Sequence, residues 1–171
     1  PEWHDVDLDN LERMFNEAIR VDNPNPTNKI VIGDSHSICM YRPGWTVNSV
    51  PFKTLNGAIN DGFDKFIPFD YEEIECYFGN IDIRHHVIRL GQKIEDLADR
   101  YIEEANKYNA KIYELLPIED VSRRIPQSGY YKGQPFYGSW SERNDARNKF
   151  NDYIEKEYGI KRWTGHLFNK E

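Results

Sequence analysis

Three side chains capable of acid–base or nucleophilic chemistry follow one another at the end of a short apolar run. Residues 29–33, Lys-Ile-Val-Ile-Gly, lead directly into Asp34, Ser35 and His36. Consecutive β-branched residues indicate a short strand buried on both faces, and open α/β sheets bind ligands at the carboxyl ends of their strands. A serine hydroxyl placed there can act as a nucleophile when a base lies beside it. Gly, Asp and Ser are also ordinary turn residues, so a strand exit without chemistry explains this stretch equally well.

A second apolar strand with a polar exit is predicted at residues 73–78. The exit, residues 79–86, reads Gly-Asn-Ile-Asp-Ile-Arg-His-His, and in a parallel sheet both exits open onto the same edge. If this exit is extended, Asp82 and His86 project to the same side. An Asp82–His86 pair could then hold an imidazole near Ser35 of the first exit. The alternative is that Asp82 forms a structural ion pair with Arg84.

The apolar periodicity predicts that strands and helices alternate along one domain spanning residues 1–171. The predicted helices are 7–20, 58–66, 92–109 and 141–158, and the predicted strands are 29–32, 50–55, 73–78 and 111–116. Residues 1–28 comprise the first helix and a Pro-rich connector, and Gly159 is expected to cap the last helix. The long Gly- and aromatic-rich loop at 118–140 is typical of a functional segment. This order predicts a three-layer α/β/α sandwich around a mainly parallel sheet.

Composition narrows the classes of partner. The chain has 171 residues and a net charge of −7, which opposes non-specific binding to nucleic acid. No apolar run is long enough to span a membrane, and Cys39 and Cys76 have no metal-ligand spacing, which favours a reducing compartment. We therefore expect a cytoplasmic or virion-associated protein, and the residue usage is typical of a bacterial or phage genome. Because the chain starts at Pro1 without a methionine, we expect a processed chain or part of a longer one.

With Gly57 between them, the two strand exits resemble the SGNH (GDSL-like) hydrolase superfamily. The likeness is closest to a branch whose first block reads Gly-Asp-Ser-His and whose third reads Phe-Gly-Glu-Ile-Asp-x-Arg, and it covers roughly residues 29–160. The resemblance implies a flavodoxin-like fold and hydrolysis of a small-molecule or glycan ester, without a cofactor or a metal. It implies that Ser35 is the nucleophile, that the Ser35 and Gly57 N–H groups hold the oxyanion, and that Asp34 shapes the turn.

The third block departs from the superfamily pattern. That block normally supplies an asparagine side chain to the oxyanion hole. Counting from Gly79, the expected position holds Ile81, and Asn80 comes one place early. Asn80 is therefore a candidate helper in the oxyanion hole rather than a matched residue.

The last block departs as well. The superfamily's base is a late histidine preceded three residues earlier by aspartate, whereas here Trp163 precedes His166. Either the last block lies beyond Glu171, or His166 works without that aspartate, or the site is degenerate. His166 and His86 are both candidate bases at this point.

Two other functions use the same residues. Asp34-Ser35-His36, Gly79-Asn80 and Gly165-His166-Leu167-Phe168 look like an incomplete calcineurin-type metallophosphoesterase, although a site that lacks ligands cannot hold two metal ions. Alternatively, the domain is a degenerate hydrolase used as a binding or structural module. The aromatic residues of 130–140, with Tyr41 and Trp45, would then line a surface for a carbohydrate or a protein partner.

Overall fold

The computed structural model describes residues 28–67, 70–118, 125, 127, 131–135 and 137–162. Its strands are β1 (Lys29–Asp34), β2 (Thr46–Val50), β3 (Glu73–Tyr77) and β4 (Lys111–Ile112). Its α-helices are α2 (Leu55–Asp61), α3 (Val87–Leu90), α4 (Ile94–Lys107) and α5 (Trp140–Glu157). Short helical turns are η2 (Ser35–Met40), η3 (Phe63–Phe66) and the π-helical η4 (Asp82–His86). The predicted helix at 7–20 and the connector after it lie outside the described residues.

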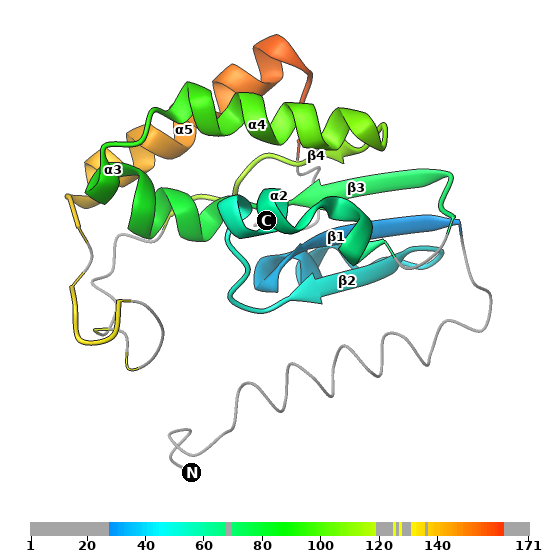
Figure 1. Ribbon diagram of the computed structural model, residues 1–171, viewed down its shortest axis with the longest axis horizontal. Coiled ribbons are helices and arrows are strands. Elements are labelled where there is room, and N and C mark those ends of the chain that lie inside the picture. The colour runs from blue at the N-terminus through cyan, green and yellow to red at the C-terminus, as the bar shows by residue number, and fades with distance from the viewer. Residues whose placement is uncertain are drawn as a thin grey trace, which may run out of the picture.

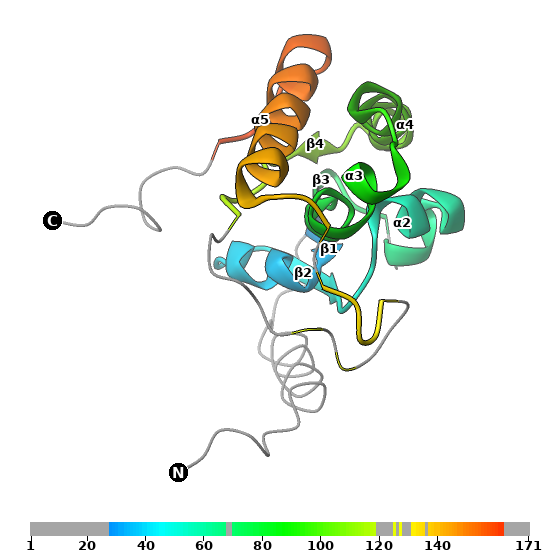
Figure 2. The same ribbon diagram turned by 90° about the vertical axis from the view of Figure 1, so that its left-hand side faces the viewer.

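The strands form one parallel sheet in the order β2-β1-β3-β4. Figure 1 shows the strands side by side, and Figure 2 looks onto their carboxyl ends, with α2 and α4 on one side of the sheet and η2 and α5 on the other. The predicted three-layer α/β/α architecture is therefore confirmed, and the strand order is that of the first four strands of a flavodoxin-like sheet. In the described part of the chain, no helix is long and apolar enough to cross a membrane.

The strand order creates a crevice between β1 and β3. From β1 the chain moves outward to β2, and from β2 it returns across β1 to β3. Right-handed crossovers then place η2 on one face and α2 on the other, so the two connections diverge where β1 and β3 end. Ligands of such sheets bind at this switch point. The two polar exits predicted to share an edge therefore lie on neighbouring strands.

The elements follow from local sequence features. Ile30, Val31 and Ile32 are fully buried, as a central strand covered on both faces requires. Helix α5 begins with a capping box, in which Ser139 Oγ accepts a hydrogen bond from Glu142 N (3.1 Å) and the Glu142 carboxylate accepts one from Ser139 N (2.7 Å). The helix ends where Gly159, at φ +93°, donates its N–H to Ile154 O. The predicted glycine cap is confirmed.

Several predicted boundaries are wrong. The second strand is 46–50 rather than 50–55, because Pro51 ends the ladder and Thr54 caps a helix that starts at Leu55. The helix predicted at 58–66 therefore starts earlier, and it breaks at Gly62 into a separate turn. The last strand, predicted at 111–116, keeps only its first two residues.

Gly33 allows the ends of β1 and β3 to approach closely. A Cβ added at Gly33 would lie 2.5 Å from Ser37 Cβ and 2.5 Å from Tyr77 O. The oxygen belongs to the backbone of β3 and cannot move away as a flexible side chain could. The absence of a side chain at this position is therefore a condition for the turn that follows β1.

We predict that Gly33→Ala lowers the free energy of unfolding by about 1–3 kcal/mol, the usual cost of forcing atoms into a packed core. Urea denaturation followed by circular dichroism measures the effect. Thr46→Ala, at a half-buried position of β2, is the control and should stay within about 1 kcal/mol of the parent. A Gly33→Ala midpoint equal to that of the parent would contradict this account of the turn.

Candidate active site

Asp34 organises the turn at the end of β1. Its carboxylate is fully buried, and Oδ1 accepts hydrogen bonds from His36 N (2.9 Å) and interacts with His36 Nδ1 (3.2 Å). Its carbonyl oxygen accepts hydrogen bonds from the hydroxyls of Ser37 and Ser49. Asp34 is thus the N-cap of η2.

Ser35 is the first residue of η2 and is partly exposed. Gly33, two residues earlier, pairs with Tyr77 of β3. Ser35 therefore lies at the carboxyl edge of the sheet, beside the crevice between β1 and β3. The residue as a whole is partly exposed, and it lies in a turn that the buried Asp34 carboxylate caps. This placement suits a nucleophile that a substrate approaches from the edge of the sheet.

His36 is a residue whose pairing the sequence did not reveal. Its ring contacts Asp34 Oδ1 through Nδ1, and its centroid lies 6.4 Å from that of the Tyr77 ring. Side chains two positions apart do not face each other along a helix, so a helical pattern after the strand would not predict this contact. The signal that could have found the contact is the Asp-x-His spacing at a strand exit, where an N-cap turns the chain back.

Asn80 is buried behind the edge of the sheet. Its Nδ2 donates a hydrogen bond to Tyr77 Oη (2.9 Å), which also accepts one from Leu116 N (3.1 Å). Burial is the main reason that the pKa of Tyr77 lies well above its ordinary value. The Asn80 amide therefore supports a buried phenol, although an amide nitrogen carries a second hydrogen that can serve elsewhere.

Asp82 does not hold a histidine in this structure. The segment predicted as extended is the helical turn η4, in which Asp82 and His86 share a side by four-residue spacing rather than by alternation. Asp82 is fully buried and accepts hydrogen bonds from Leu55 N (2.6 Å), Asn56 N (3.2 Å) and Asn56 Nδ2 (2.9 Å). Its carboxylate is committed to the first turn of α2. A pair with Arg84, the other sequence expectation, is not among its contacts with the described residues.

Gly57 also differs from its expected environment. It lies inside α2 rather than at a turn, and its N–H donates a hydrogen bond to Thr54 Oγ1 (2.9 Å). This is the ordinary N-cap bond of a helix. An oxyanion could use this N–H only by sharing it with Thr54 or displacing that hydroxyl.

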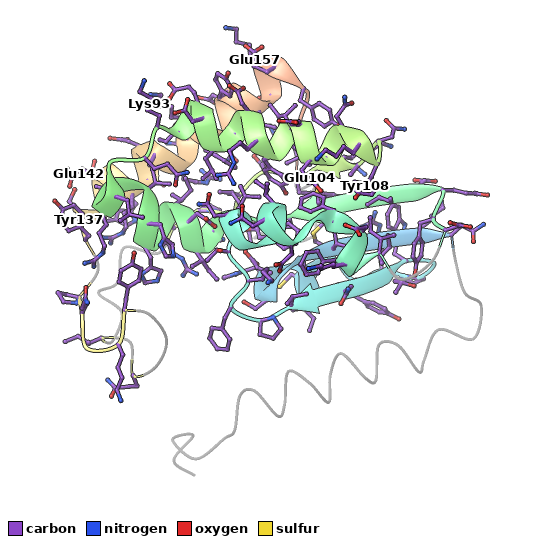
Figure 3. The ribbon with its side chains drawn as sticks, in the orientation of Figure 1. Lys93, Glu104, Tyr108, Tyr137, Glu142 and Glu157 are labelled. Carbon is purple, nitrogen blue, oxygen red and sulfur yellow. The ribbon has the colours of Figure 1, made fainter. Side chains whose placement is uncertain are left out.

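His86 belongs to a cluster in which Tyr131 and Tyr137 contact side chains of η4 and α3. Its Nδ1 lies 3.0 Å from Tyr131 Oη, and the Arg89 guanidinium lies over the rings of Tyr131 (4.6 Å) and Tyr137 (5.4 Å). Figure 3 shows Tyr137 at the same end of the molecule as Glu142 and the end of α3. Burial lowers the pKa of His86, with the Asp82 charge opposing and the Arg89 charge adding to the effect. The contact with Tyr131 uses the Nδ1 atom of the His86 ring.

The remaining candidate, His166, lies outside the described residues. The chain is followed as far as Arg162, and Lys161 forms a parallel bridge with Tyr113, next to β4. Among the residues with described positions, no group of three or more His, Cys, Asp or Glu side chains could hold a metal ion.

No protein-family model matches the chain, and no curated protein matches its sequence. Among solved structures, a Streptococcus pneumonia protein named as a platelet activating factor aligns with a TM-score of 0.46 and 12% identity, covering 90% of this chain and 72% of its own. The psychrotrophic esterase EstA from a Pseudoalteromonas species aligns with a TM-score of 0.44 and 10% identity, covering 80% of this chain and 77% of its own. At these values, neither likeness identifies a family or an activity for this chain.

We predict that Asp82→Asn lowers the free energy of unfolding by about 1–3 kcal/mol, because one acceptor oxygen facing buried N–H groups is lost. Burial raises the pKa of Asp82 above 3.8. At this site the folded state therefore binds a proton more tightly than the unfolded state. The contribution of Asp82 to the free energy of unfolding is fully present below pH 3.8 and decreases as the pH rises through the folded-state pKa. The difference in the free energy of unfolding between parent and variant should therefore shrink as the pH rises through the folded-state pKa. Urea denaturation at successive pH values measures it.

Asp61→Asn is the matched control with the opposite sign. The pKa of Asp61 is lowered by its hydrogen bond to Lys53, so its contribution is present above 3.8 and is lost as the pH falls. A parent-to-variant difference for Asp82→Asn that grows with pH would show that folding lowers the pKa of Asp82 rather than raising it.

Proposed function

We propose that this protein is a serine hydrolase of the SGNH type that acts on an ester, with an acyl group on a carbohydrate as the favoured substrate class. The observation that carries the proposal is the position of Ser35. It starts the turn at the carboxyl end of β1, it is partly exposed, and it lies beside the exit of β3 at the switch point of the sheet. The Gly-Asp-Ser-His and Phe-Gly-Asn-Ile-Asp-Ile-Arg blocks support the same assignment by resemblance.

In the proposed reaction, Ser35 Oγ attacks the ester carbonyl carbon while a base takes the hydroxyl proton. The carbonyl oxygen becomes an oxyanion, which the Ser35 N–H is best placed to stabilise because it belongs to the same turn. The C–O bond then breaks, the alcohol leaves with the proton from the base, and water hydrolyses the acyl-serine by the same route in reverse. Asn80 and Gly57 would assist only by sharing the hydrogen bonds that they already make.

His166 is the better candidate for the base. Tyr131 contacts His86 Nδ1, and the carboxylate of Asp82 accepts its hydrogen bonds from α2, so Asp82 does not orient the His86 ring as predicted. His166 therefore stays as the proposed base, as the late histidine that the resemblance to the superfamily's last block implies.

A binding or structural module without catalysis is the second candidate. One observation favours it: the two helper donors expected in the oxyanion hole, Gly57 N–H and Asn80 Nδ2, both have partners within the protein. A site that must give up internal hydrogen bonds to stabilise an oxyanion has less to offer the transition state than one with donors held ready. In that case Ser35 would contact a ligand without attacking it.

A fluorophosphonate probe distinguishes the two functions. We expect the folded protein to be labelled at Ser35 and the Ser35→Ala variant to remain unlabelled, as read by intact-protein and peptide mass spectrometry. His166→Ala should slow labelling by about 10²-fold or more, since that is the usual contribution of a positioned base.

His86→Gln tests the other base. If His86→Gln abolishes labelling while His166→Ala retains it, the assignment of the base is reversed. If the folded parent protein does not react, the hydrolase proposal is wrong and the binding module is favoured.

A further inference from the structure

Phe52 is an exposed aromatic residue in a backbone conformation that usually belongs to glycine. Its φ is +59°, and 73% of its surface is exposed. A positive φ crowds Cβ against the backbone, so a bulky side chain adopts it only at a cost in free energy. Among the described residues other than glycine, Asn109 alone shares this conformation. Asparagine tolerates it because its amide can bond to the nearby backbone, whereas a phenyl ring cannot.

The turn around Phe52 shows how the strained backbone is held. Lys53 N donates a hydrogen bond to Val50 O (3.3 Å), which closes a four-residue turn with Pro51 second and Phe52 third. The negative φ of proline followed by a positive φ defines a type II turn, whose third position favours glycine or asparagine. Val50 ends β2, and the Lys53 ammonium pairs with Asp61 at the end of α2. The turn is therefore anchored to the sheet on one side and to a helix on the other.

This turn lies at the carboxyl edge of the sheet, next to the proposed nucleophile. Val50 of β2 pairs with Asp34 of β1. Ser35 and Pro51 are therefore the next positions after two neighbouring strands, which lie about 4.8 Å apart. Figure 2 shows the ends of β1 and β2 side by side. Phe52 follows Pro51 directly, so its exposed ring belongs to the same edge as Ser35, one strand away.

Folding alone gives no reason for a phenylalanine at this position. Single exposed apolar residues are common on protein surfaces, but a glycine or an asparagine here would relax the backbone and lose little buried area. Strain that the surrounding structure enforces is typical of sites that contact a ligand. An aromatic ring on a rigid turn also loses little conformational entropy when a ligand binds. The Phe52 ring is thus suited to binding.

The exposure of the ring favours a sugar over an acyl chain as its ligand. An acyl chain gains most when apolar surface surrounds it, and a ring with 73% of the residue exposed can cover only one side of it. A sugar ring differs, because its C–H groups can lie flat against an aromatic face while its hydroxyl groups stay in water. One exposed aromatic face is enough for such a contact.

We propose that Phe52 is a specificity-determining residue that binds the sugar ring of an acylated carbohydrate while the ester group lies at Ser35. The proposal rests on the proposed function, because it identifies the part of that ester that the protein recognises outside the reacting atoms. A contact of this kind favours sugar esters over simple alkyl esters and leaves the chemistry at Ser35 unchanged.

Sugar binding can be tested without any turnover in the Ser35→Ala variant. The probes are the methyl glycosides of glucose, galactose and N-acetylglucosamine. Saturation-transfer NMR should show transfer from the protein to the ring protons of at least one of them, and the signal should disappear in Ser35→Ala/Phe52→Gly. The absence of a signal for all three, or a signal that survives Phe52→Gly, would overturn the proposal.

Phe52→Gly also separates recognition from folding. Glycine suits a positive φ, so the urea midpoint of the variant should be equal to or above that of the parent. A lower midpoint would show that Phe52 is held for stability and would count against a binding role.

Kinetics on the mono-acetylated form of the bound glycoside give the size of the effect. Phe52→Gly should lower kcat/KM for this ester by about 10-fold, mainly through KM, as expected for the loss of one aromatic contact. Its kcat/KM for ethyl acetate and its rate of labelling by a small alkyl fluorophosphonate should stay within about twofold of the parent. Phe52→Trp keeps an aromatic face and should retain activity on the sugar ester.

Asn109→Gly is the matched control. It makes the same change at a positive φ, but Asn109 precedes β4 and so lies toward the opposite edge of the parallel sheet. Its kcat/KM for the sugar ester should stay within about twofold of the parent, the range of a change remote from the site. An equal loss of kcat/KM in Asn109→Gly and Phe52→Gly would refute a specific contact with Phe52.

The two sets of measurements separate the two proposals. A glycoside signal that depends on Phe52, in a protein that fluorophosphonate never labels, would sustain the sugar contact and refute the hydrolase. Labelling of Ser35 with a sugar-ester kcat/KM that Phe52→Gly does not change would sustain the hydrolase and refute the sugar contact.

Discussion

The close approach of β1 and β3 is the constraint on which the rest of the site depends. Two parallel strands can lie about 4.8 Å apart anywhere in a sheet, but here the chain must also turn back over the end of β1 to form η2. Gly33 permits both, since any side chain would overlap Tyr77 O and Ser37 Cβ at 2.5 Å. With that turn in place, Ser35 lies beside the crevice between β1 and β3.

The buried carboxylates at this edge of the sheet accept hydrogen bonds from backbone amides. Asp34 and Asp82 are both fully buried, and burying a charged group is costly unless hydrogen bonds replace its water. Asp34 obtains one from His36 N, and Asp82 obtains two from Leu55 N and Asn56 N. Charge-assisted bonds of this kind are among the stronger ones in proteins. The acidic residues that would suit a catalytic dyad are therefore used to start helices.

This use of carboxylates also explains what the sequence could and could not predict. The apolar runs of β1 and β3 and the amphipathic α4 were predictable, because burial on two faces or on one helical face dictates their composition. The stretch at 50–55 was not, since Val50 to Leu55 is as apolar as a strand and only Pro51 and Thr54 reveal a helix start. At 82–86, the alternation of polar and apolar residues mimicked a strand while a four-residue spacing fitted as well. The partners of Asp82 lie 26 or more residues away in the chain, beyond the reach of any local pattern.

Glu75 is another buried carboxylate, but its partners are the cations Arg42 and Lys161 rather than backbone amides. A carboxylate with 1% exposure gains little net stability from its two cations, because desolvation offsets most of the attraction. Such a pair can instead fix how two neighbouring segments align, since a shift by one residue would leave a buried charge unpaired. Lys161 is held in one register with β4 by this pair and by its backbone bonds to Ile112 and Glu114. In the proposed enzyme, this selectivity for register, rather than added stability, is the physical reason for keeping a charged group inside the sheet.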